Sequence, residues 1–123
     1  MNGEFSAPVR AVIVGRDLGC CVRCSRPVAH LTPGWDWSVH HRRPRGMGGT
    51  SLPWVGWPAN GVVLCGHGTD GCHGWVESNR EVAFEEGWLV ALNGVVIAAE
   101  VPMRHALFGR VLLDDEGEWE LAA

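Results

Sequence analysis

Apolar positions along the first third of the chain predict one helix followed by two strands. Residues 6–8, Ser-Ala-Pro, are typical of a helix N-cap and first turn. Apolar side chains then recur with helical spacing over residues 9–18, up to a stop at Gly19. Two short runs, residues 28–31 and 35–41, have the composition of strands, and a Thr-Pro-Gly turn separates them. The second expected strand ends in two adjacent histidines.

The middle of the chain combines a long loop with a short apolar strand. Residues 42–59 are rich in glycine and proline, and ordered loops of that length usually carry function. Asn60 then opens an apolar run, residues 62–64, which ends in Cys65. A helical segment is expected to begin at Cys72.

The pattern of the last third predicts a further helix and two hairpins. Ser78 and Glu81 match a capping box that starts the helix, and Gly87 closes it. An Asn-Gly dipeptide at residues 93–94 and an acidic turn at Gly117 each lie between apolar runs, which predicts hairpins. The expected strand pairs are residues 88–92 with 95–99 and residues 110–113 with 118–121.

Length and the first residues limit the class of protein. At 123 residues the chain fits one domain, residues 1–123, with a modest core. Its start lacks the basic and long apolar regions of a signal peptide, and no apolar run approaches the length that a bilayer needs. We therefore expect an intracellular protein without a membrane partner, whose paired cysteines are metal ligands rather than disulfides.

Charge is divided unevenly along the chain, although the total is −4. Residues 1–45 hold seven arginines against three acids, giving +4, whereas residues 81–123 hold nine acids against two arginines, giving −7. A chain divided in this way can bind phosphate with one part and repel it with another. The acidic C-terminal hairpins are therefore better suited to docking a protein than to facing DNA.

Four of the five cysteines form two pairs with the chemistry of a structural zinc site. Cys21 and Cys24 have the two-residue separation of a zinc knuckle, and Cys65 and Cys72 supply the second pair. Six residues separate the second pair, more than the usual spacing of about two to four, and His67 lies between its members as a rival ligand. The alternative is that these cysteines are small buried residues.

The histidine pair suits hydrolysis at phosphorus. His40 and His41 are neighbours on an expected strand, so their side chains point to opposite faces. In an in-line displacement the attacking water and the leaving oxygen also lie on opposite sides, which fits a base on one face and a metal ligand on the other. His73 is the natural second ligand, and Glu77, one helical turn later, is a further candidate.

Three stretches in this order resemble the motif of the HNH endonucleases: VHHRRPRGMGG, ANGVVLC and GCHGWVES. The resemblance covers about residues 20–80, half the chain, and its specificity lies in order, spacing and cysteine pairs taken together. It implies an α+β fold in which a zinc-stapled treble clef carries a ββα-metal (His-Me finger) active site. The C-terminal β-hairpins over residues 88–123 would extend this core.

The same resemblance implies a role for each candidate site residue. His41 would be the general base that activates water, and Asn60 would orient the strand that holds it. His40 and His73 would bind one divalent cation, such as Mg²⁺ or Mn²⁺, which stabilises the scissile phosphate and the 3′ leaving oxygen. Many members have a histidine or asparagine where Glu77 stands, so the third ligand stays open. The products would carry 5′-phosphate and 3′-hydroxyl ends.

Three arginines follow the histidine pair directly. Arg42, Arg43 and Arg45 would hold backbone phosphates next to the cut, a role that fixes register without reading sequence. A solvated surface run is the alternative, but the position beside the histidines favours phosphate binding. Most of the seven tryptophans are expected in the core, with Trp54 or Trp57 in the loop as candidates for base stacking.

The short, tryptophan-rich pattern is most similar to the small HNH endonucleases of tailed bacteriophages and prophages, some of which act beside the terminase in DNA packaging. It implies a phosphodiester hydrolase that nicks or cuts double-stranded DNA with low sequence specificity, in the cytoplasm of an infected or lysogenic bacterial host. Phage terminase or portal proteins are further expected partners. The alternative is a catalytically silent zinc treble-clef module that binds nucleic acid or a terminase partner.

Overall fold

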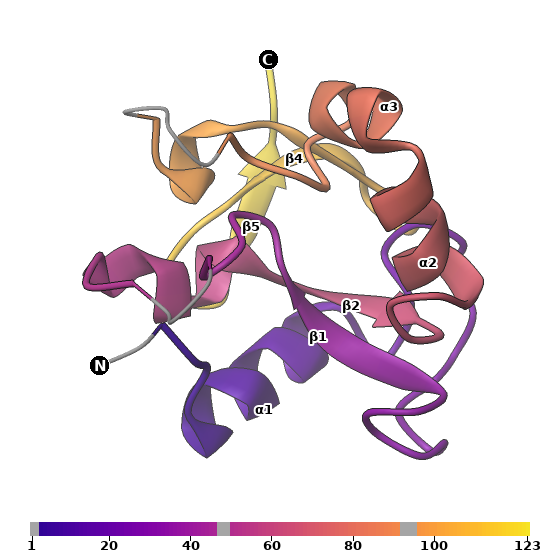
Figure 1. Cartoon of the computed structure of the whole chain (residues 1–123). Coiled ribbons are helices and arrows are strands. Elements are labelled where there is room, and N and C mark those ends of the chain that lie inside the picture. Colours follow the sequence, from indigo (N-terminus) through magenta and orange to yellow (C-terminus); the bar gives the residue numbers. More distant parts are fainter. Residues whose placement is uncertain (1–2, 47–49, 92–95) are drawn as a thin grey trace.

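Two small antiparallel sheets and three α-helices form the described part of the chain, so the fold is α+β (Figure 1). The computed structural model describes residues 3–46, 50–91 and 96–123. The α-helices are α1 (Ala7–Arg16), α2 (Gly71–Ser78) and α3 (Arg80–Glu85). The strands are β1 (Trp37–His41), β2 (Gly61–Cys65), β3 (Met103–His105), β4 (Gly109–Leu113) and β5 (Trp119–Leu121). Three short 3-10 helices are η1 (Pro53–Gly56), η2 (Pro58–Asn60) and η3 (Ala98–Glu100).

α1 begins where the sequence predicts it, because Ser6 caps it. The Ser6 hydroxyl accepts a hydrogen bond from the Val9 amide at 3.3 Å, which satisfies one of the free donors of the first turn. Ile13 is fully buried and anchors the helix in the core. The helix ends at Arg16, somewhat earlier than expected, and Leu18 then turns the chain away with a φ of 56°.

β1 and β2 pair with each other and carry the histidine pair. Their register places Trp37 opposite Cys65 and His41 opposite Gly61. Position 61 needs glycine, because a Cβ there would lie 2.4 Å from the Ile13 side chain. α1 and α2 lie on opposite sides of this two-stranded sheet, so the two faces of β1 meet different helices (Figure 1).

The expected strand over residues 28–31 is wrong. The Val28 and Ala29 amides both donate to the Gly19 carbonyl, and the Leu31 amide donates to the Val28 carbonyl. This stretch is therefore a turn that closes the cysteine loop against the end of α1. The Val28, Ala29 and Leu31 amides donate to carbonyls inside the loop, so they do not pair with β1.

The expected capping box is also wrong. α2 continues through Ser78, so Asn79 becomes the N-cap residue of α3, and its side chain makes no cap bond. The Asn79 side-chain amide donates instead to the Trp75 carbonyl at 2.9 Å. Gly87 does close α3 as expected, with a φ of 80° that favours glycine.

The first expected hairpin is not borne out by the described residues around it. Its turn, residues 92–95, lies outside the described part of the chain, and on the far side residues 98–100 form η3 rather than a strand. The Val90 amide donates to the Arg42 carbonyl at 2.8 Å, and the Ala98 carbonyl accepts from the Arg42 guanidinium at 3.1 Å. These backbone groups therefore pair with Arg42 rather than with each other.

The second expected hairpin is present as β4 and β5, with Gly117 in the turn at a φ of 85°. The sequence pattern does not predict β3, which pairs with β4 and buries Met103 and His105. The Ala106 amide donates to the Val22 carbonyl at 2.7 Å, so this sheet docks on the loop that holds the first cysteine pair.

A buried ionic network ties α1 to both sheets. The Asp17 carboxylate accepts two hydrogen bonds from Arg16 at 2.9 Å each, one from the His105 ring at 3.1 Å and one from the Val63 amide at 3.1 Å. Burial acts to raise the pKa of Asp17, but these hydrogen bonds and the Arg16 charge outweigh it and hold the pKa below its usual value. The Arg16 guanidinium also donates to the Gly61 carbonyl, which fixes the start of β2.

Candidate metal and histidine site

The structure brings the four paired cysteines together. The sulfurs of Cys21, Cys24, Cys65 and Cys72 all lie within 4.8 Å of one another. Cys24 Sγ and Cys65 Sγ are 3.8 Å apart, close to the edge of about 3.8 Å that a tetrahedron with Zn–S bonds of about 2.3 Å requires. All four are free thiols. The group therefore fits a tetrahedral metal ion of the zinc type.

Burial disfavours the ionised form of two of these cysteines, whereas at Cys24 the effect of partial burial is outweighed by hydrogen bonds that lower the pKa. Burial raises the pKa of Cys72 to about 11, and it raises the pKa of Cys21 as well. The Cys72 amide donates to Cys65 Sγ at 3.3 Å, and the Arg23 guanidinium donates to Cys72 Sγ at 3.3 Å. A bound dication would replace the thiol protons, which is the usual way in which thiolate sites and metal ions stabilise each other.

The rival ligand His67 and the fifth cysteine, Cys20, both lie apart from this site. His67 is not among the residues grouped around the sulfurs, and its Nδ1 accepts hydrogen bonds from the Thr69 amide and hydroxyl. Its ring lies 4.9 Å from the ring of Trp35. Cys20, the unpaired cysteine, places its thiol 3.4 Å from the Leu18 carbonyl. The structure therefore favours a four-cysteine site over one that includes His67.

A second group of candidate ligands lies between β1 and α2. His40, His73 and Glu77 place their ligand atoms within 4.8 Å of one another. His73 and Glu77 are one turn apart on α2, and the His40 and His73 rings lie 5.2 Å apart, edge to face. Ser38, two residues before His40 on the same face of β1, places its hydroxyl 3.0 Å from His73 Nδ1. That contact leaves His73 Nε2 available to a metal ion.

His40 has the protonation state that a ligand needs. Its Nε2 lies 3.0 Å from the Trp88 carbonyl oxygen, which can only accept, so Nε2 carries the proton and Nδ1 keeps its lone pair. Burial, helped by the neighbouring His73, lowers the pKa of His40 to about 3. Burial also lowers the pKa of His73, with Glu77 acting in the opposite direction. Both imidazoles are therefore neutral at neutral pH.

Glu77 is shared between this group and solvent. Its carboxylate accepts from the Arg80 guanidinium at 3.1 Å, and both side chains are more than a third exposed. An exposed ion pair of this kind contributes about 0–1 kcal/mol, so it competes weakly with a metal ion for the carboxylate.

His41 points to the other face of β1, toward α1. Its Nε2 lies 2.8 Å from the Gly3 carbonyl oxygen, so Nε2 donates and Nδ1 keeps the lone pair of a base. The Phe5 ring stacks on the imidazole at 4.0 Å with an interplanar angle of 12°. Burial lowers the pKa of His41 below its usual value, although the bond to Gly3 acts in the opposite direction.

Asn60 fixes the chain that follows the histidine pair. It is fully buried, its Oδ1 accepts from the Arg43 amide at 2.8 Å, and its Nδ2 donates to the Arg43 carbonyl at 3.1 Å and the Val55 carbonyl at 2.8 Å. The Arg42 amide donates to the Asn60 carbonyl at 2.8 Å. Asn60 therefore holds the backbone immediately after His41, and its side chain hydrogen-bonds to Arg43 and Val55 rather than to the His41 ring.

The prediction that Arg42 binds a DNA phosphate is wrong. Its side chain is fully buried, and its guanidinium donates to four backbone carbonyls over 2.8–3.1 Å. Those carbonyls belong to Gly87, Ala59, Ala98 and Val101. Burial lowers the pKa of Arg42 to about 9, so the side chain stays charged at neutral pH. Arg42 is a structural cross-link under the site rather than part of its surface.

The other two arginines of the run lie nearer the surface. Arg43 is half-buried, with its guanidinium 5.6 Å from the centre of the Trp54 ring. Arg45 pairs with Glu4 at 3.5 Å, and its side chain is about a third exposed. Arg45 lines the same depression as the histidines and is therefore the better placed of the two to contact an anion there.

One depression of about 270 Å³ brings the candidate site residues to the surface. It is lined by Ser38, Val39, His40, His41, Pro44, Arg45, His73 and Glu77. The histidines from both faces of β1 thus border one space. Gly3, Phe5 and Trp88 support this site, but the sequence does not point to them, because each acts through a contact between distant parts of the chain. Ser38 shares the strand face of His40 and is the one supporting residue that alternation along the strand could have indicated.

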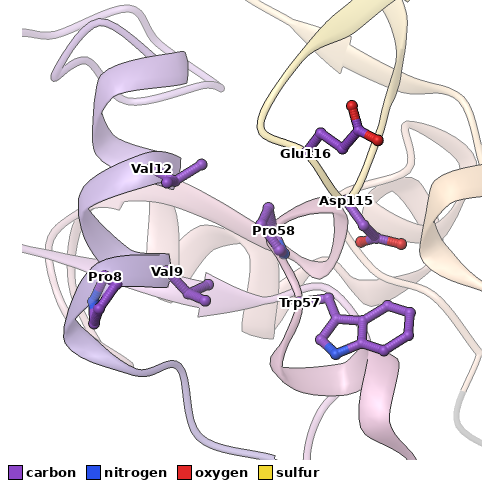
Figure 2. A pocket seen from close by; sticks show the side chains of 7 residues that line it. All are labelled: Pro8, Val9, Val12, Trp57, Pro58, Asp115 and Glu116. Carbon is purple, nitrogen blue, oxygen red and sulfur yellow. The ribbon is translucent and has the colours of Figure 1, made fainter.

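A larger groove of about 510 Å³ lies elsewhere, between α1 and the turn that joins β4 to β5 (Figure 2). Pro8, Val9, Val12, Trp57 and Pro58 supply its apolar lining, and Asp115 and Glu116 supply carboxylates. Figure 2 shows both acids on the hairpin turn, with Asp115 beside the Trp57 ring. The groove shares no lining residue with the histidine depression.

Comparison with known proteins places the chain in no family: no family model, curated protein or solved structure matches it. No helix in the described ranges is both long and apolar enough to cross a membrane.

Proposed function

We propose that this chain is a metal-dependent DNA endonuclease of the HNH class, in which a treble-clef zinc scaffold carries a ββα-metal active site. One observation carries the proposal. His41, a neutral histidine with a free Nδ1, and His40, one of three candidate metal ligands, come from opposite faces of β1. Both border the same depression as the other two ligands, His73 and Glu77 of α2. The order β1, β2, α2 supports the ββα assignment, and the cysteine cluster beside it supports the zinc scaffold.

In this proposal His41 is the general base. It takes a proton from water at Nδ1, while the Gly3 carbonyl and the Phe5 ring hold the imidazole in one orientation. Asn60 is a positioning residue, because it fixes the backbone at Arg43, two residues after the base, and its side chain hydrogen-bonds there rather than to the His41 ring. The activated water attacks the phosphorus, and the products carry 5′-phosphate and 3′-hydroxyl ends.

A divalent cation such as Mg²⁺ or Mn²⁺ would be held by His40 Nδ1, His73 Nε2 and the Glu77 carboxylate. Two imidazoles and one carboxylate form a donor set that first-row divalent cations accept, and the neutral state of both histidines suits it. When bound, the cation supplies charge stabilisation for the phosphate and the leaving oxygen.

The distribution of charge supports double-stranded DNA as the substrate. Arg45 at the depression and the half-buried Arg43 would contact backbone phosphates, which carry no sequence information. The acidic residues 81–123 would keep the rest of the molecule off the DNA. Low sequence specificity follows, and a single site cuts one strand at a time, so nicks are the first product.

A supercoiled-plasmid assay tests the proposal. Purified protein is incubated with Mg²⁺, with Mn²⁺ and with chelator, beside His41→Ala and a control variant, His30→Ala, at an exposed histidine. We expect nicking that needs metal, that His41→Ala slows by about 100-fold or more, and that His30→Ala leaves unchanged. Plasmid that stays equally intact with wild type and His41→Ala across all metals would rule out catalysis.

The groove in Figure 2 favours a second candidate function, the docking of a protein segment that carries an arginine or lysine next to an apolar side chain. Trp57 and Val12 are 46% and 41% exposed on its apolar side, and Asp115 and Glu116 offer complementary charge. A phage terminase or portal protein in a bacterial host is the partner class that the sequence resemblance suggests. This function would also suit a module that has no catalysis.

Short peptides test the docking function without knowledge of the partner. Acetylated Leu-Arg amide is expected to shift the Trp57 indole signal in NMR spectra, and acetylated Leu-Glu amide is not. The double variant Asp115→Asn, Glu116→Gln should abolish the shift, because it removes both charges while the amide oxygen at position 115 can still accept from the Ala59 amide. Equal shifts with the two peptides, or none with either, would contradict the docking function.

A further inference from the structure

Arg23 lies inside the first cysteine pair and joins two features that are otherwise separate. Its guanidinium donates to Cys72 Sγ at 3.3 Å and stacks on the Trp75 ring, 3.6 Å from the ring centre. The Trp88 ring lies 5.6 Å away on another side, and the two tryptophans meet edge to face at 6.0 Å. One cation thus contacts the cysteine cluster, α2 and the segment after α3.

The position of this guanidinium is not explained by its own hydrogen bonding. Arg23 Nε is buried and has no hydrogen-bond partner among the described residues. A buried donor without a partner is costly, and a neutral thiol is a weak acceptor, so the contacts with the tryptophan rings are the main compensation when the sulfur is protonated. The same position becomes more favourable if the sulfur is a thiolate, because the guanidinium that donates to Cys72 Sγ then also gains the attraction of a full negative charge at 3.3 Å.

Charge balance points in the same direction. A dication held by four thiolates leaves the cluster with a net charge of −2, and in the described part of the chain Arg23 is the charged side chain that donates to one of its sulfurs. Metal sites commonly depend on such outer hydrogen bonds to orient their ligands. The arrangement is therefore built for the metal-loaded cluster.

The contact also reaches the histidine site. The Trp88 carbonyl accepts the hydrogen bond from His40 Nε2, and Trp75 lies on α2 between His73 and Glu77. Arg23 therefore packs against Trp75 of α2, the helix that carries His73 and Glu77. It also lies near Trp88, whose carbonyl holds His40.

We propose that Arg23 is a positioning residue for the four-cysteine metal site, where it donates a charge-assisted hydrogen bond to the Cys72 thiolate and braces Trp75 and Trp88 around it. The proposal concerns the zinc-type site and does not depend on nuclease activity.

The experiment compares Arg23→Met, Arg23→Lys and Arg26→Met in the full chain. Arg26 is exposed in the same loop, and its side chain makes no hydrogen bond or cation–π contact with the described residues. Its variant therefore removes an equal charge but no side-chain contact with the cluster. Competition with a chromophoric chelator measures zinc affinity. We expect a loss of about 10-fold to 100-fold in Arg23→Met, a smaller loss in Arg23→Lys and a change within about twofold in Arg26→Met.

The absorption spectrum of the Co²⁺-substituted protein separates a hydrogen bond to sulfur from a purely structural role, because a purely structural role would leave the sulfur-to-cobalt band unchanged. Loss of the N–H to sulfur bond raises the energy of the Cys72 lone pair, so the sulfur-to-cobalt charge-transfer band is expected at lower energy in Arg23→Met and at the wild-type position in Arg26→Met. If Arg23→Met does not fold even with zinc, the zinc affinity and the cobalt band position of Arg23→Lys test the proposal instead. Wild-type affinity and an unmoved band in the Arg23 variants, or a wild type that binds no zinc, would overturn the proposal.

Discussion

His40 and His41 show how one step along a strand separates two chemistries. His40 faces α2, is buried, and offers Nδ1 to a shared group with His73. His41 faces α1 and is held by Gly3 and Phe5. Because strand side chains alternate, identical residue types receive different partners, and we propose different tasks for them. The assignment of His41 as base and His40 as ligand follows from these partners.

The lowered pKa of His41 predicts the pH dependence of cleavage. The base must be neutral, so the rate should rise with pH, reach half its plateau below about 6.5, the usual histidine value, and stay level through neutral pH. Single-turnover cleavage at saturating Mn²⁺ between about pH 5 and pH 8 measures this. A half-maximal rate well above neutral pH would show that another group, with a raised pKa, is the base.

Substitutions of Arg42 and Arg45 should affect different properties. Loss of Arg42 should lower the stability of the protein, and loss of Arg45 should weaken DNA binding. Arg42→Met leaves three buried carbonyls and one partly buried carbonyl without their donor and should lower the free energy of unfolding by about 3–5 kcal/mol. Arg45→Gln should change stability by about 0.5 kcal/mol or less but weaken DNA binding and reduce its salt dependence by about one counterion. Urea titration and DNA binding at several salt concentrations test the pair. Equal stability of Arg42→Met and wild type would contradict the structural role.

The sequence reveals the residue types of the site better than their environments. The cysteine pairs and His40 with His73 come together as expected, because ligand spacing and strand alternation are local features. Arg42 lies in the same run as Arg45 but points inward, and a charge run does not show which member meets free carbonyls in the core. Gly3, which binds His41, lies too far along the chain for any local pattern to indicate it.

At the scale of elements, the structure departs from the sequence pattern where tertiary hydrogen bonds replace local ones. Residues 28–31 have strand composition, yet the Gly19 carbonyl accepts hydrogen bonds from the Val28 and Ala29 amides. Ser78 and Glu81 match a capping box, yet α2 runs on through Ser78. The helix α1 and the hairpin of β4 and β5 are predicted correctly, because a serine cap and an acidic glycine turn act locally.

Metal removal should affect the elements unequally. β2 ends in Cys65, and Cys72 is the second residue of α2, so the cysteine cluster holds both elements that meet at the histidine group. Chelation should lower amide exchange protection in α2 by about 10-fold or more, with a smaller change in β4. Hydrogen exchange with and without chelator tests this. A uniform loss across α2 and β4, or none, would contradict a local role for the metal.

At the scale of the whole molecule, charge and fold divide the surface between two regions. The depression with the histidines and Arg45 lies in the part of the chain that carries the arginines, and the acidic hairpin borders the separate apolar groove. The sequence predicts this division from charge alone. It does not predict the groove, since that surface forms only when the β4–β5 turn packs beside α1 (Figure 2).

The central claim is that the two faces of β1 hold a metal ligand and a general base. It is tested most directly by measuring Mn²⁺ affinity and plasmid cleavage rate together for His41→Ala and His40→Ala. We expect His41→Ala to bind Mn²⁺ within about threefold of wild type and to cleave about 100-fold or more slowly at saturating metal. His40→Ala should lose Mn²⁺ affinity. If His41→Ala cleaves as fast as wild type, or if the two variants lose Mn²⁺ affinity equally, the division of roles is contradicted.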